Sequence, residues 1–409
     1  MNSQKTVAYV SHIFPALTES FVYREVFALQ ERGFNIETFA IWKPVKDKLS
    51  LESRHLVDST FYVLPIRWAD FIGAHLHFLF TRPARYLKTL WFVLTRPGES
   101  ISHRRRTFLH FCEAICMARE MQRLNVEHIH AHFAINAATI ALVISRLLDI
   151  SYSFTAHNSF FIDRVLLPEK VHGARFISVI SQFSRQFLMD LVPGGEEQGA
   201  KMHIIRCGLA PDDFSPPDAR PDNDIPLILF VAQLAERKGA PFLVEACRIL
   251  AERGVPFHCA LIGDGPEKPL VDHLVEKYDL QASFELPGAV FQEDLRPYLE
   301  RADIFALPCI TARNNDVDGI PVSLMEAMAM EIAAVSTDVS GIPELIEDGV
   351  SGLLVPEKDA EALADALQRL IEDAALRRTL GQNGRKRIVE EFNIYKSAAK
   401  LGDLFERYL

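Results

Sequence analysis

The chain has 409 residues, of which 49% are hydrophobic, and its formal net charge is −10. This length exceeds one ordinary domain and predicts two, each of roughly 180 to 210 residues. The hydrophobic content excludes extensive disorder, and the negative charge argues against nucleic acid as a partner.

The sequence contains no pattern typical of secretion or membrane spanning. Its six cysteines form no Cys-x-x-Cys pair, which indicates reduced thiols. The first twenty residues lack the apolar core and cleavage site of a secretory signal, and no apolar run reaches about 18 residues. We therefore expect a cytoplasmic protein without a transmembrane helix.

The first half of the chain alternates between strand and helix patterns. Residues 5–14 predict a buried strand, and residues 18–33 predict a helix that Thr18 can cap. A strand at 35–42 completes a strand–helix–strand unit, which implies a parallel sheet with a right-handed crossover. The later elements predicted in this half are strands at 127–134, 151–158 and 175–181 and helices at 136–148 and 182–191.

Residues 61–100 depart from this alternation. Two apolar stretches flank the cationic segment "TRPARYLK", and residues 61–110 hold eight basic residues against two acidic ones. One interpretation is a helical insertion packed on the first domain. The other is a basic, aromatic-rich face that lies on an anionic membrane surface, and both can hold together. The basic residues are Arg67, Arg82, Arg85, Lys88, Arg96, Arg104, Arg105 and Arg106.

A linker and a second alternating half follow. Residues 207–226 contain five prolines and five aspartates, a composition typical of a linker. Two tandem α/β domains, each wound like a Rossmann fold, account for the pattern, with ligands expected at the carboxyl ends of the strands. The elements predicted after the linker are strands at 227–234, 257–263, 304–308 and 333–337 and helices at 240–254, 267–280, 322–330 and from 359 onward.

The stretch "DGIPVSLMEAMA", residues 318–329, carries two carboxylates that flank a predicted helix start. Asp318 lies in the loop, Glu326 lies within the helix, and Pro321 suits its first turn. Gly319 allows a ligand to approach the backbone closely. Because a helix N-terminus favours an anion, the pair suits a ligand with sugar, diphosphate and ribose in a row. The alternative is a solvated acidic helix start.

Two other single residues follow predicted strands. Lys238 precedes a helix and can neutralise a phosphate, although a solvated lysine would have the same pattern. His157 lies at the sheet edge where α/β enzymes place catalytic groups, although a lone histidine is usually structural. The segment "GDGP" at 263–266 lacks the third glycine of a dinucleotide fingerprint and predicts a strand-ending turn.

Three histidines, His128, His130 and His132, alternate along one predicted strand and therefore share a face. His-x-His is a metal-ligand arrangement in some hydrolases. No Asp-rich or Glu-x-x-His partner accompanies it in the sequence. A polar strand end that faces a cleft is the simpler interpretation, and metal binding stays open as the alternative.

Taken together, these stretches resemble the retaining glycosyltransferases of family four. The family pattern of an acid, Gly, an aliphatic residue, Pro, four residues and Glu matches "DGIPVSLME", preceded by "VAQLAERKG" and "LIGDGP". The match extends over about 205–360 and continues more loosely in "SHIFPALTESFVYREV", "HIHAHF" and "FTAHN". The sequence is similar in particular to bacterial exopolysaccharide enzymes of the colanic-acid type.

The resemblance implies an α/β fold of the GT-B class, with two Rossmann-like domains facing each other across a deep cleft. It implies an N-terminal acceptor domain at 1–206 with a helical, basic insertion at about 61–125. The nucleotide-sugar domain would occupy 207–391, and a C-terminal helix at 392–409 would cross back to the first domain.

The resemblance also implies roles for matched residues. His157, Asp318 and Lys238 would be the catalytic residues: His157 and Asp318 contact the donor sugar, and Lys238 binds the diphosphate. Glu326 would hold the ribose hydroxyls. The further substrate-binding residues that it implies are Gly319, Ile320, Pro321, Gln233 and Thr18. No metal and no cofactor is expected, because Lys and helix N-termini stabilise the leaving diphosphate.

Two positions depart from the family pattern. Asp318 stands where the family usually has Glu, which shortens the reach by one methylene. Gln233 stands where the family usually has Arg, which weakens the diphosphate clamp. Either Gln233 donates a neutral hydrogen bond, or Arg237 or Arg313 substitutes for the missing cation.

The sequence therefore predicts a hexosyltransferase that retains anomeric configuration. It would move a sugar from a UDP or GDP donor to a lipid-linked glycan in surface polysaccharide synthesis, at the inner face of the plasma membrane. One alternative is a non-catalytic scaffold of an assembly complex, in which Gln233 marks lost activity. Another is a metal-dependent hydrolase built on the three histidines.

Overall fold

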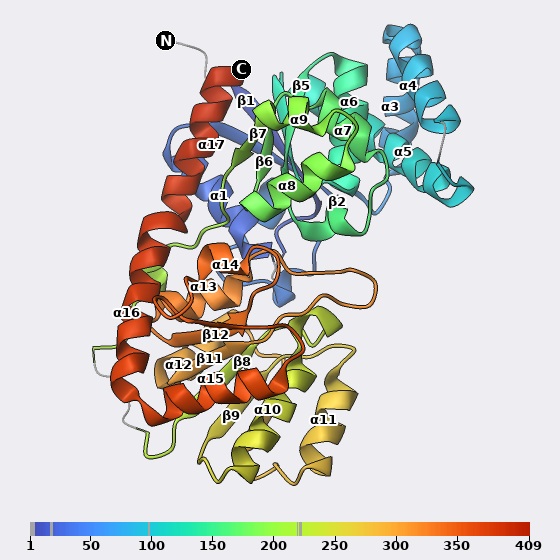
Figure 1. Cartoon of the computed structure of the whole chain (residues 1–409). Helices are drawn as coiled ribbons and strands as arrows, with labels where there is room; N and C mark the ends of the chain where they lie inside the picture. Colours follow the sequence, from blue (N-terminus) through green and yellow to red (C-terminus); the bar gives the residue numbers. More distant parts are fainter. Residues whose placement is uncertain (1–4, 17–18, 97–98, 219, 221–222) are drawn as a thin grey trace. The chain divides into compact units, whose positions relative to one another are not determined.

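The computed structural model describes residues 5–409 except 17–18, 97–98, 219 and 221–222. The chain divides into two compact units, shown in Figure 1. Unit 1 comprises Met1–Ile205 together with Ser397–Leu409, and unit 2 comprises Arg206–Lys396. In the part of the chain that the structure describes, no helix combines the length and the hydropathy needed to cross a bilayer.

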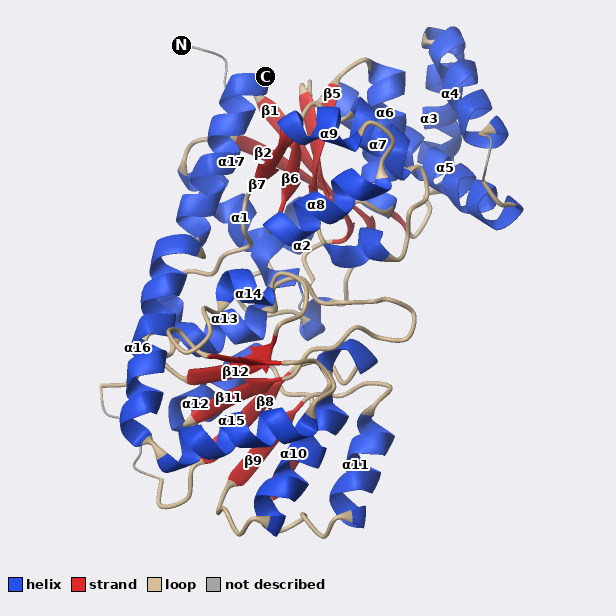
Figure 2. Ribbon diagram, viewed as in Figure 1, coloured by secondary structure: helices blue, strands red, loops and turns tan. Residues whose placement is uncertain are grey.

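Unit 1 is built on a parallel sheet with helices on both faces (Figure 2). The strand order is β3-β2-β1-β4-β5-β6-β7, which is the order of a doubly wound fold. The central strands are buried, as expected where helices cover both faces of a sheet. The strands are β1 (Thr6–Ile13), β2 (Asn35–Trp42), β3 (Phe61–Leu64), β4 (His128–His132), β5 (Ser151–Ala156), β6 (Ile177–Val179) and β7 (Met202–Ile204).

The helices of unit 1 follow their apolar stripes. In α1 the buried stripe contains Val22, Val26 and Leu29, as the sequence predicts. The helix N-cap is Glu19, without a side-chain cap, and Thr18 lies outside the described residues. The helices are α1 (Ser20–Glu31), α2 (Leu56–Ser59), α3 (Trp68–Thr81), α4 (Pro83–Thr95), α5 (Ile101–Arg123), α6 (Asn136–Leu148), α7 (Leu167–Gly173), α8 (Gln182–Leu191), α9 (Gly195–Gln198) and α17 (Ile394–Tyr408).

The chain returns to unit 1 at its end through α17. The apolar residues of this helix that join the core of unit 1 are Ala398, Leu401, Leu404 and Phe405. They pack with residues of β1 and α1, and Arg32 at the end of α1 forms an ion pair with Asp403 at 3.3 Å. The last helix is therefore part of the folded core of the first unit rather than a free tail.

The helical insertion of unit 1 begins later in the chain than residue 61, the start that the sequence predicts. Residues 61–64 form β3, which pairs with β2 through Phe39 and Phe61, so the helical part begins only at Trp68. α3 and α4 pack on α5, and α4 also packs on α6. Figure 1 shows these helices at the side of unit 1 opposite α17.

Unit 2 repeats the same design with the strand order β10-β9-β8-β11-β12-β13, and all its strand pairs are parallel. The strands are β8 (Leu227–Val231), β9 (His258–Ile262), β10 (Phe284–Gly288), β11 (Ile304–Leu307), β12 (Ala333–Thr337) and β13 (Leu353–Val355). The helices are α10 (Ala240–Glu252), α11 (Lys268–Lys277), α12 (Gln292–Arg301), α13 (Val322–Ala329), α14 (Ile342–Leu345), α15 (Ala360–Glu372) and α16 (Ala374–Glu391).

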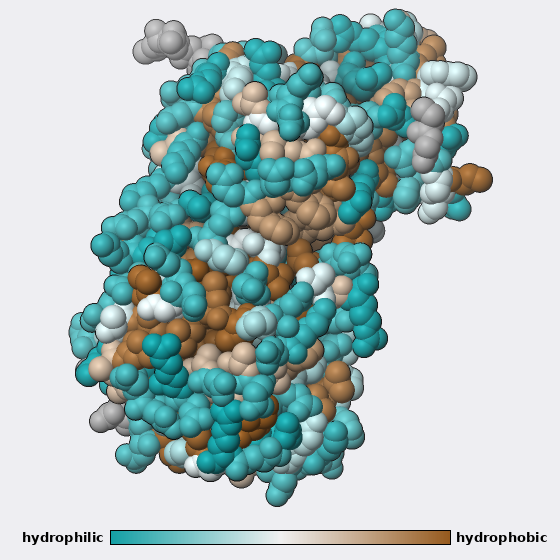
Figure 3. All heavy atoms as spheres, in the orientation of Figure 1, coloured by the Kyte–Doolittle hydropathy of each residue, from teal (hydrophilic) through white to brown (hydrophobic). Residues whose placement is uncertain are grey.

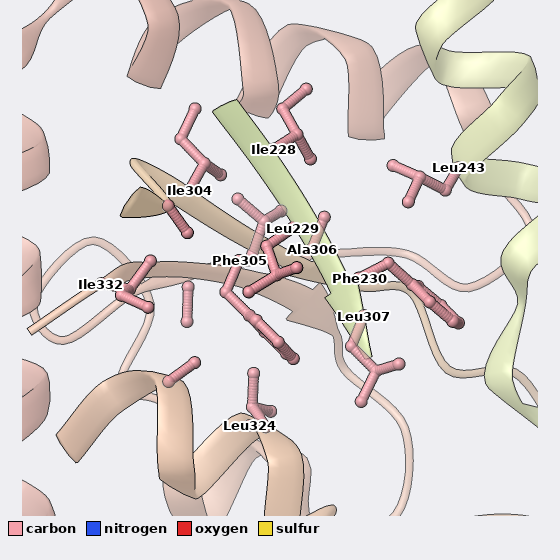
Figure 4. Packing of buried hydrophobic residues seen from close by; sticks show 14 of the residues in the cluster. Ile228, Leu229, Phe230, Leu243, Ile304, Phe305, Ala306, Leu307, Leu324 and Ile332 are labelled. Atoms are coloured by element: carbon pink, nitrogen blue, oxygen red, sulfur yellow. The ribbon is translucent and has the colours of Figure 1, made fainter. Parts of the chain in front are cut away.

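The core of unit 2 lies around its two central strands (Figure 4). Ile228 and Phe230 on β8 and Phe305 on β11 are fully buried. Leu324 of α13 packs in the same cluster, which fixes the helix that follows the 308–321 loop. The prediction of two Rossmann-like α/β units with parallel sheets is confirmed.

Candidate functional site

The candidate residues of unit 2 lie on two loops that the topology brings together. β8 and β11 are neighbours at the point where the strand order reverses, and ligands of such sheets bind there, beyond the carboxyl ends of the strands. The loop after β8 carries Lys238, and the loop after β11 carries Asp318. Two residues eighty positions apart therefore meet at one edge of the sheet.

A glycine turn places Lys238 at this edge. Gly239 has φ +67°, and a Cβ there would lie 1.9 Å from the carbonyl oxygen of Pro308. The backbone N–H of Ile310 donates to the carbonyl of Arg237 at 2.9 Å. The turn before α10 is thus tied to the loop after β11, and only glycine can follow Lys238 without displacing it.

Asp318 lies between two cations. The Lys238 ammonium pairs with one carboxylate oxygen, and Arg237 Nε lies 3.4 Å from the other. The Lys238 and Asp318 side chains are only 12% and 15% exposed. Burial raises the pKa of Asp318, but the two cations outweigh burial and leave its pKa below the ordinary value. Asp318 is therefore ionised at neutral pH and accepts hydrogen bonds.

The structure distinguishes the two arginines considered as replacements for the cation missing at Gln233. Gln233 is exposed, and Arg313 is 95% exposed and pairs with Glu236. Arg237 is only 28% exposed and contacts Asp316 at 2.9 Å as well as Asp318. Arg237 is thus the arginine that lies beside Lys238 in this site.

Asp318 precedes α13 and Glu326 lies within it, as predicted. One detail differs: Pro321 is the N-cap residue rather than part of the first turn, because its ψ of 129° is extended. Glu326 is 5% exposed, and no acidic residue occupies the first turn of the helix. Gly319, Ile320 and Pro321 are buried. The helix start therefore keeps the positive end of its dipole without an acidic neighbour in its own first turn.

The segment 263–266 is a strand-ending turn, as predicted. Gly263 has φ +151°, and a Cβ there would lie 1.9 Å from the Ala232 carbonyl oxygen. Asp264 accepts a backbone hydrogen bond from Leu234 at 2.9 Å. The turn after β9 thus supports the β8 loop that carries Lys238.

His157 of unit 1 follows β5 directly and is 6% exposed. Its Nε2 lies 3.2 Å from Nδ1 of His132, the last residue of β4. Burial, together with the charge of His132, lowers the pKa of His157. The ring of Phe133 lies 4.6 Å from the His157 ring. His157 is therefore a neutral imidazole held in a defined place.

Sequence reasoning did not single out Glu25, which the structure places next to this pair. Glu25 of α1 is 8% exposed, accepts a hydrogen bond from Tyr9 at 2.9 Å and lies 3.0 Å from His132 Nε2. A signal was present, because Glu25 lies three residues after Val22 and so falls on the apolar stripe of the helix. A carboxylate on a stripe that enters the core needs a buried partner.

The three histidines of β4 are buried among polar groups. Ligand atoms of Glu25, His130 and His132 lie within 4.8 Å of one another and could hold a metal ion. Both ring nitrogens of His130 already contact hydroxyls of β5, at Ser153 and Thr155. Among the described residues, the contacts therefore favour a hydrogen-bonded network over a metal site.

Comparison with known proteins identifies the family of unit 2. A sequence model of the family described as glycosyl transferases group 1 matches residues 212–387, which include Lys238, Asp318 and Glu326. Residues 212–387 belong to the glycosyl transferases group 1 family. The family resemblance read from the sequence motifs is thereby confirmed.

Two curated relatives each match about half of the chain. The amylovoran biosynthesis glycosyltransferase AmsK of Erwinia amylovora is 41% identical over 208 residues, covering 51% of each chain. A protein of Escherichia coli (strain K12) named for colanic acid biosynthesis, the glycosyltransferase WcaL, is 40% identical over 194 residues, 47% of this chain and 48% of that protein. The chain spans about half the length of these curated relatives in the matches.

Solved structures establish the fold over the whole chain. A sucrose-phosphate synthase of Thermosynechococcus elongatus has a TM-score of 0.74 at 21% identity and covers 99% of both chains. HepE of Anabaena in complex with UDP-glucose has a TM-score of 0.73 at 14% identity, covering 98% of this chain and 99% of that chain. Together with the two Rossmann-like units, this likeness establishes the GT-B fold.

Proposed function

We propose that the protein is a retaining glycosyltransferase. It moves a hexose from a nucleoside-diphosphate donor, UDP or GDP, to a lipid-linked glycan in exopolysaccharide or cell-surface polysaccharide synthesis. The observation that carries the proposal is the largely buried Asp318 between Lys238 and Arg237, at the strand ends of a group 1 glycosyltransferase domain. The names of AmsK and WcaL support the polysaccharide context.

The charges of the site suit a diphosphate leaving group. Lys238 and Arg237 would stabilise the charge that develops on the diphosphate as the bond to the sugar breaks, and no metal is needed for that step. Asp318 would accept hydrogen bonds from sugar hydroxyls, and Glu326 from the ribose. The acceptor hydroxyl forms the new bond on the face that the diphosphate leaves, and its proton passes to the departing phosphate oxygen.

Gln233 does not by itself favour the scaffold alternative. The position lacks a cation, but Arg237 brings one to Asp318 from four residues further along the chain. A decayed site would not be expected to keep two partly buried cations around a buried carboxylate, because such a charge cluster is costly to maintain without a ligand. We therefore favour catalysis.

The helical segment α3 to α5 supports a place at the membrane surface. Trp68, Ile72, Leu76 and Phe80 of α3 are exposed at four-residue spacing and so form one stripe, and Leu87, Trp91 and Leu94 continue on α4. Figure 3 shows hydrophobic residues among hydrophilic ones over this segment. Apolar stripes with aromatic residues and nearby cations are typical of helices that lie in a membrane interface.

The three basic residues at the start of α4 have different contacts. Arg82 donates to the carbonyls of Leu147 and Leu148 at the end of α6, so it supports the fold. Arg85 pairs with Asp149 at 2.7 Å, whereas Lys88 is exposed beside Trp91. We infer peripheral contact with an anionic bilayer at the inner face of the plasma membrane, with Lys88 as the cation most available to lipid.

The function is tested by binding and transfer. We expect one of UDP, GDP or their sugars to stabilise the protein in a thermal-shift screen, by about 2.7 kcal/mol at a hundredfold excess over Kd. Glu326→Ala should abolish this shift, while Glu390→Ala, an exposed glutamate of α16, should retain it. Sugar transfer to a lipid-linked glycan extract is then followed by mass spectrometry. No nucleotide-dependent shift, or an equal shift in Glu326→Ala, would contradict the assignment.

A further inference from the structure

One groove of unit 1 lies along the exposed stripe of α4. Its volume is about 620 Å³, and its lining includes Leu87, Lys88, Trp91 and Phe92 of α4 and Arg146 of α6. Because residues three and four apart share one side of a helix, Lys88 lies on the same face as Trp91 and Phe92. Arg146 reaches this face because α4 packs on α6. The groove therefore combines apolar walls with cations from two helices.

Arg146 is held in the groove by an aromatic ring rather than by an acid. Its guanidinium carbon lies 4.1 Å from the centroid of the Phe92 ring. Such stacking covers one face of the guanidinium group and leaves the N–H donors at its edge available. No described residue accepts a hydrogen bond from Arg146 or forms an ion pair with it. These donors can therefore bind an anion that comes from outside the chain.

Lys88 is the second cation of the groove without an acidic partner among the described residues. Its side chain is exposed beside Trp91. Arg96 also lines the groove, but it pairs with Glu169 of α7. Two cations that donate charge-assisted hydrogen bonds are well suited to a phosphate group. An anion in the groove would therefore be bound by Lys88 and Arg146.

The apolar walls of the groove indicate which kind of anion it suits. Leu87 and Trp91 are 53% and 70% exposed, and Leu94 extends the same stripe. A free phosphate would leave these side chains in water. A phospholipid would place its headgroup at the two cations and its acyl chains along the stripe, which removes apolar surface from water. Tryptophan is also typical of the headgroup level of a bilayer.

The position of Arg146 in the fold favours a bilayer phospholipid over the glycan acceptor. Arg146 lies in the last turn of α6, before the amino end of β5, whereas His157 follows the carboxyl end of β5. The six residues of that strand span roughly 17 Å at about 3.3 Å per residue. A phosphate bound at Arg146 therefore lies toward the end of the sheet opposite to the candidate site residues.

We propose that Lys88 and Arg146 bind the headgroup phosphate of an anionic bilayer phospholipid, whose acyl chains lie along Leu87 and Trp91. A zwitterionic choline lipid is disfavoured, because its ammonium group would be repelled by the two cations. The inference rests on the proposed contact with an anionic bilayer and deepens it, because it names the lipid and the residues that bind it.

The test uses dihexanoyl phosphatidylglycerol, brominated on its acyl chains and kept below its micellar concentration. Single lipids rather than a charged surface then meet the full chain. Trp42→Phe with Trp68→Phe leaves Trp91 as the only tryptophan, and bromine quenches its fluorescence on contact. We expect saturable quenching, and the matching phosphatidylcholine should bind roughly tenfold more weakly.

Three variants in this background separate a site from a general positive potential. Arg146→Gln should raise the Kd for phosphatidylglycerol roughly tenfold or more, because charge-assisted hydrogen bonds are lost. Lys88→Gln, at an exposed position, should raise it roughly fivefold. Arg105→Gln is the matched control, because it removes one charge from an exposed position of α5 outside the groove. Its Kd should be unchanged.

Several results would overturn the headgroup site. One is an equal effect of Arg146→Gln and Arg105→Gln. If Arg146→Gln does not fold, an unchanged Kd in Lys88→Gln has the same meaning. Others are absence of saturable quenching, equal binding of phosphatidylcholine, and equally effective competition by inorganic phosphate. Tighter competition by geranyl diphosphate would instead assign the groove to a lipid-linked acceptor and also overturn it.

Vesicle flotation of the wild type separates this site from the proposed membrane contact. Binding to anionic vesicles without quenching by single lipids would overturn the headgroup site alone. Saturable quenching without binding to vesicles would support the headgroup site and count against the proposed membrane contact. Sugar transfer enters neither measurement, so its absence would count only against the proposed enzymatic function.

Discussion

At the scale of single residues, the charge of Asp318 depends on its neighbours. Its side chain is largely buried, and an isolated buried carboxylate would resist ionisation. Lys238 and Arg237 reverse that tendency and keep the pKa of Asp318 below its ordinary value. The Asp at this position, where the related family usually has Glu, therefore keeps the charge that a sugar-binding acceptor needs.

Removing Lys238 should affect turnover and the state of Asp318 together. We expect Lys238→Ala to lower kcat roughly 100- to 1000-fold, because a cation on the leaving diphosphate is lost. The pKa of Asp318 should rise at the same time, since one of its two cations is gone. Steady-state kinetics with the donor found by thermal shift measures the first effect. Lys277→Ala, an exposed lysine of α11, is the control, and normal kinetics in Lys238→Ala would remove this residue from the site.

The environment of Glu19 predicts that the stability of the protein depends on pH. Burial raises the pKa of Glu19 from 4.5 to about 7, and the charge of His132 partly offsets this. The pKa of Glu19 is higher in the folded state than in the unfolded state. Its contribution to the free energy of unfolding is therefore fully present below pH 4.5 and is lost as the pH rises through about 7. At pH 8 the free energy of unfolding of Glu19→Gln should therefore exceed that of the wild type by at most about 3 kcal/mol.

Urea unfolding at pH 5 and pH 8 measures this difference. Glu31→Gln, an exposed glutamate at the end of the same helix, should leave the pH dependence unchanged. Equal pH dependence in the wild type and Glu19→Gln would show that Glu19 is not desolvated.

At the scale of elements, strands inside a sheet could be predicted from the sequence, whereas strands at its edges could not. Among the described residues, the sequence predicted the nine strands that lie inside the two sheets, while the edge strands β3, β7, β10 and β13 were not predicted. Most interior strands are covered on both faces and are therefore apolar runs, although β4 carries three histidines. Edge strands are short and partly exposed, and β10 even contains Pro287, which an edge strand tolerates.

The turn before α10 offers a test of how one element positions the site. Gly239→Ala should destabilise the protein by roughly 2 to 4 kcal/mol, from the left-handed φ and from overlap with the Pro308 carbonyl. Donor affinity should also fall, because Lys238 is displaced.

Gly254→Ala is a matched control for that prediction. Gly254 also has a left-handed φ, +71°, but nothing lies within 4 Å of its added Cβ. The free energy of unfolding of this variant should fall by only about 1 to 2 kcal/mol, and the variant should bind donor normally. Equal losses in chemical unfolding would show that the Pro308 contact is not what restricts residue 239.

At the scale of the whole molecule, the exposed stripes of α3 and α4 predict where the protein works. Phe80→Ser with Trp91→Ser should weaken binding to anionic vesicles roughly tenfold or more, because two large apolar side chains no longer enter the interface. Flotation with phosphatidylglycerol-containing vesicles measures this, and phosphatidylcholine vesicles test the requirement for anionic lipid. Phe291→Ser, an exposed aromatic of unit 2, is the control. Equal binding by the double variant and the wild type would refute the membrane face.

The sequence by itself determined the two α/β units, the interior strands and the strand-end positions of Lys238, Asp318 and His157. These follow from local patterns, since apolar runs, caps and turn residues report only on neighbouring positions. Only the tertiary structure decided that Arg237, rather than Arg313, forms an ion pair with Asp318. It alone joined Tyr9, Glu25 and His132 to His157. Such partners come from separate strands and helices, and their contacts depend on which side chains the folded sheet brings within a few ångströms.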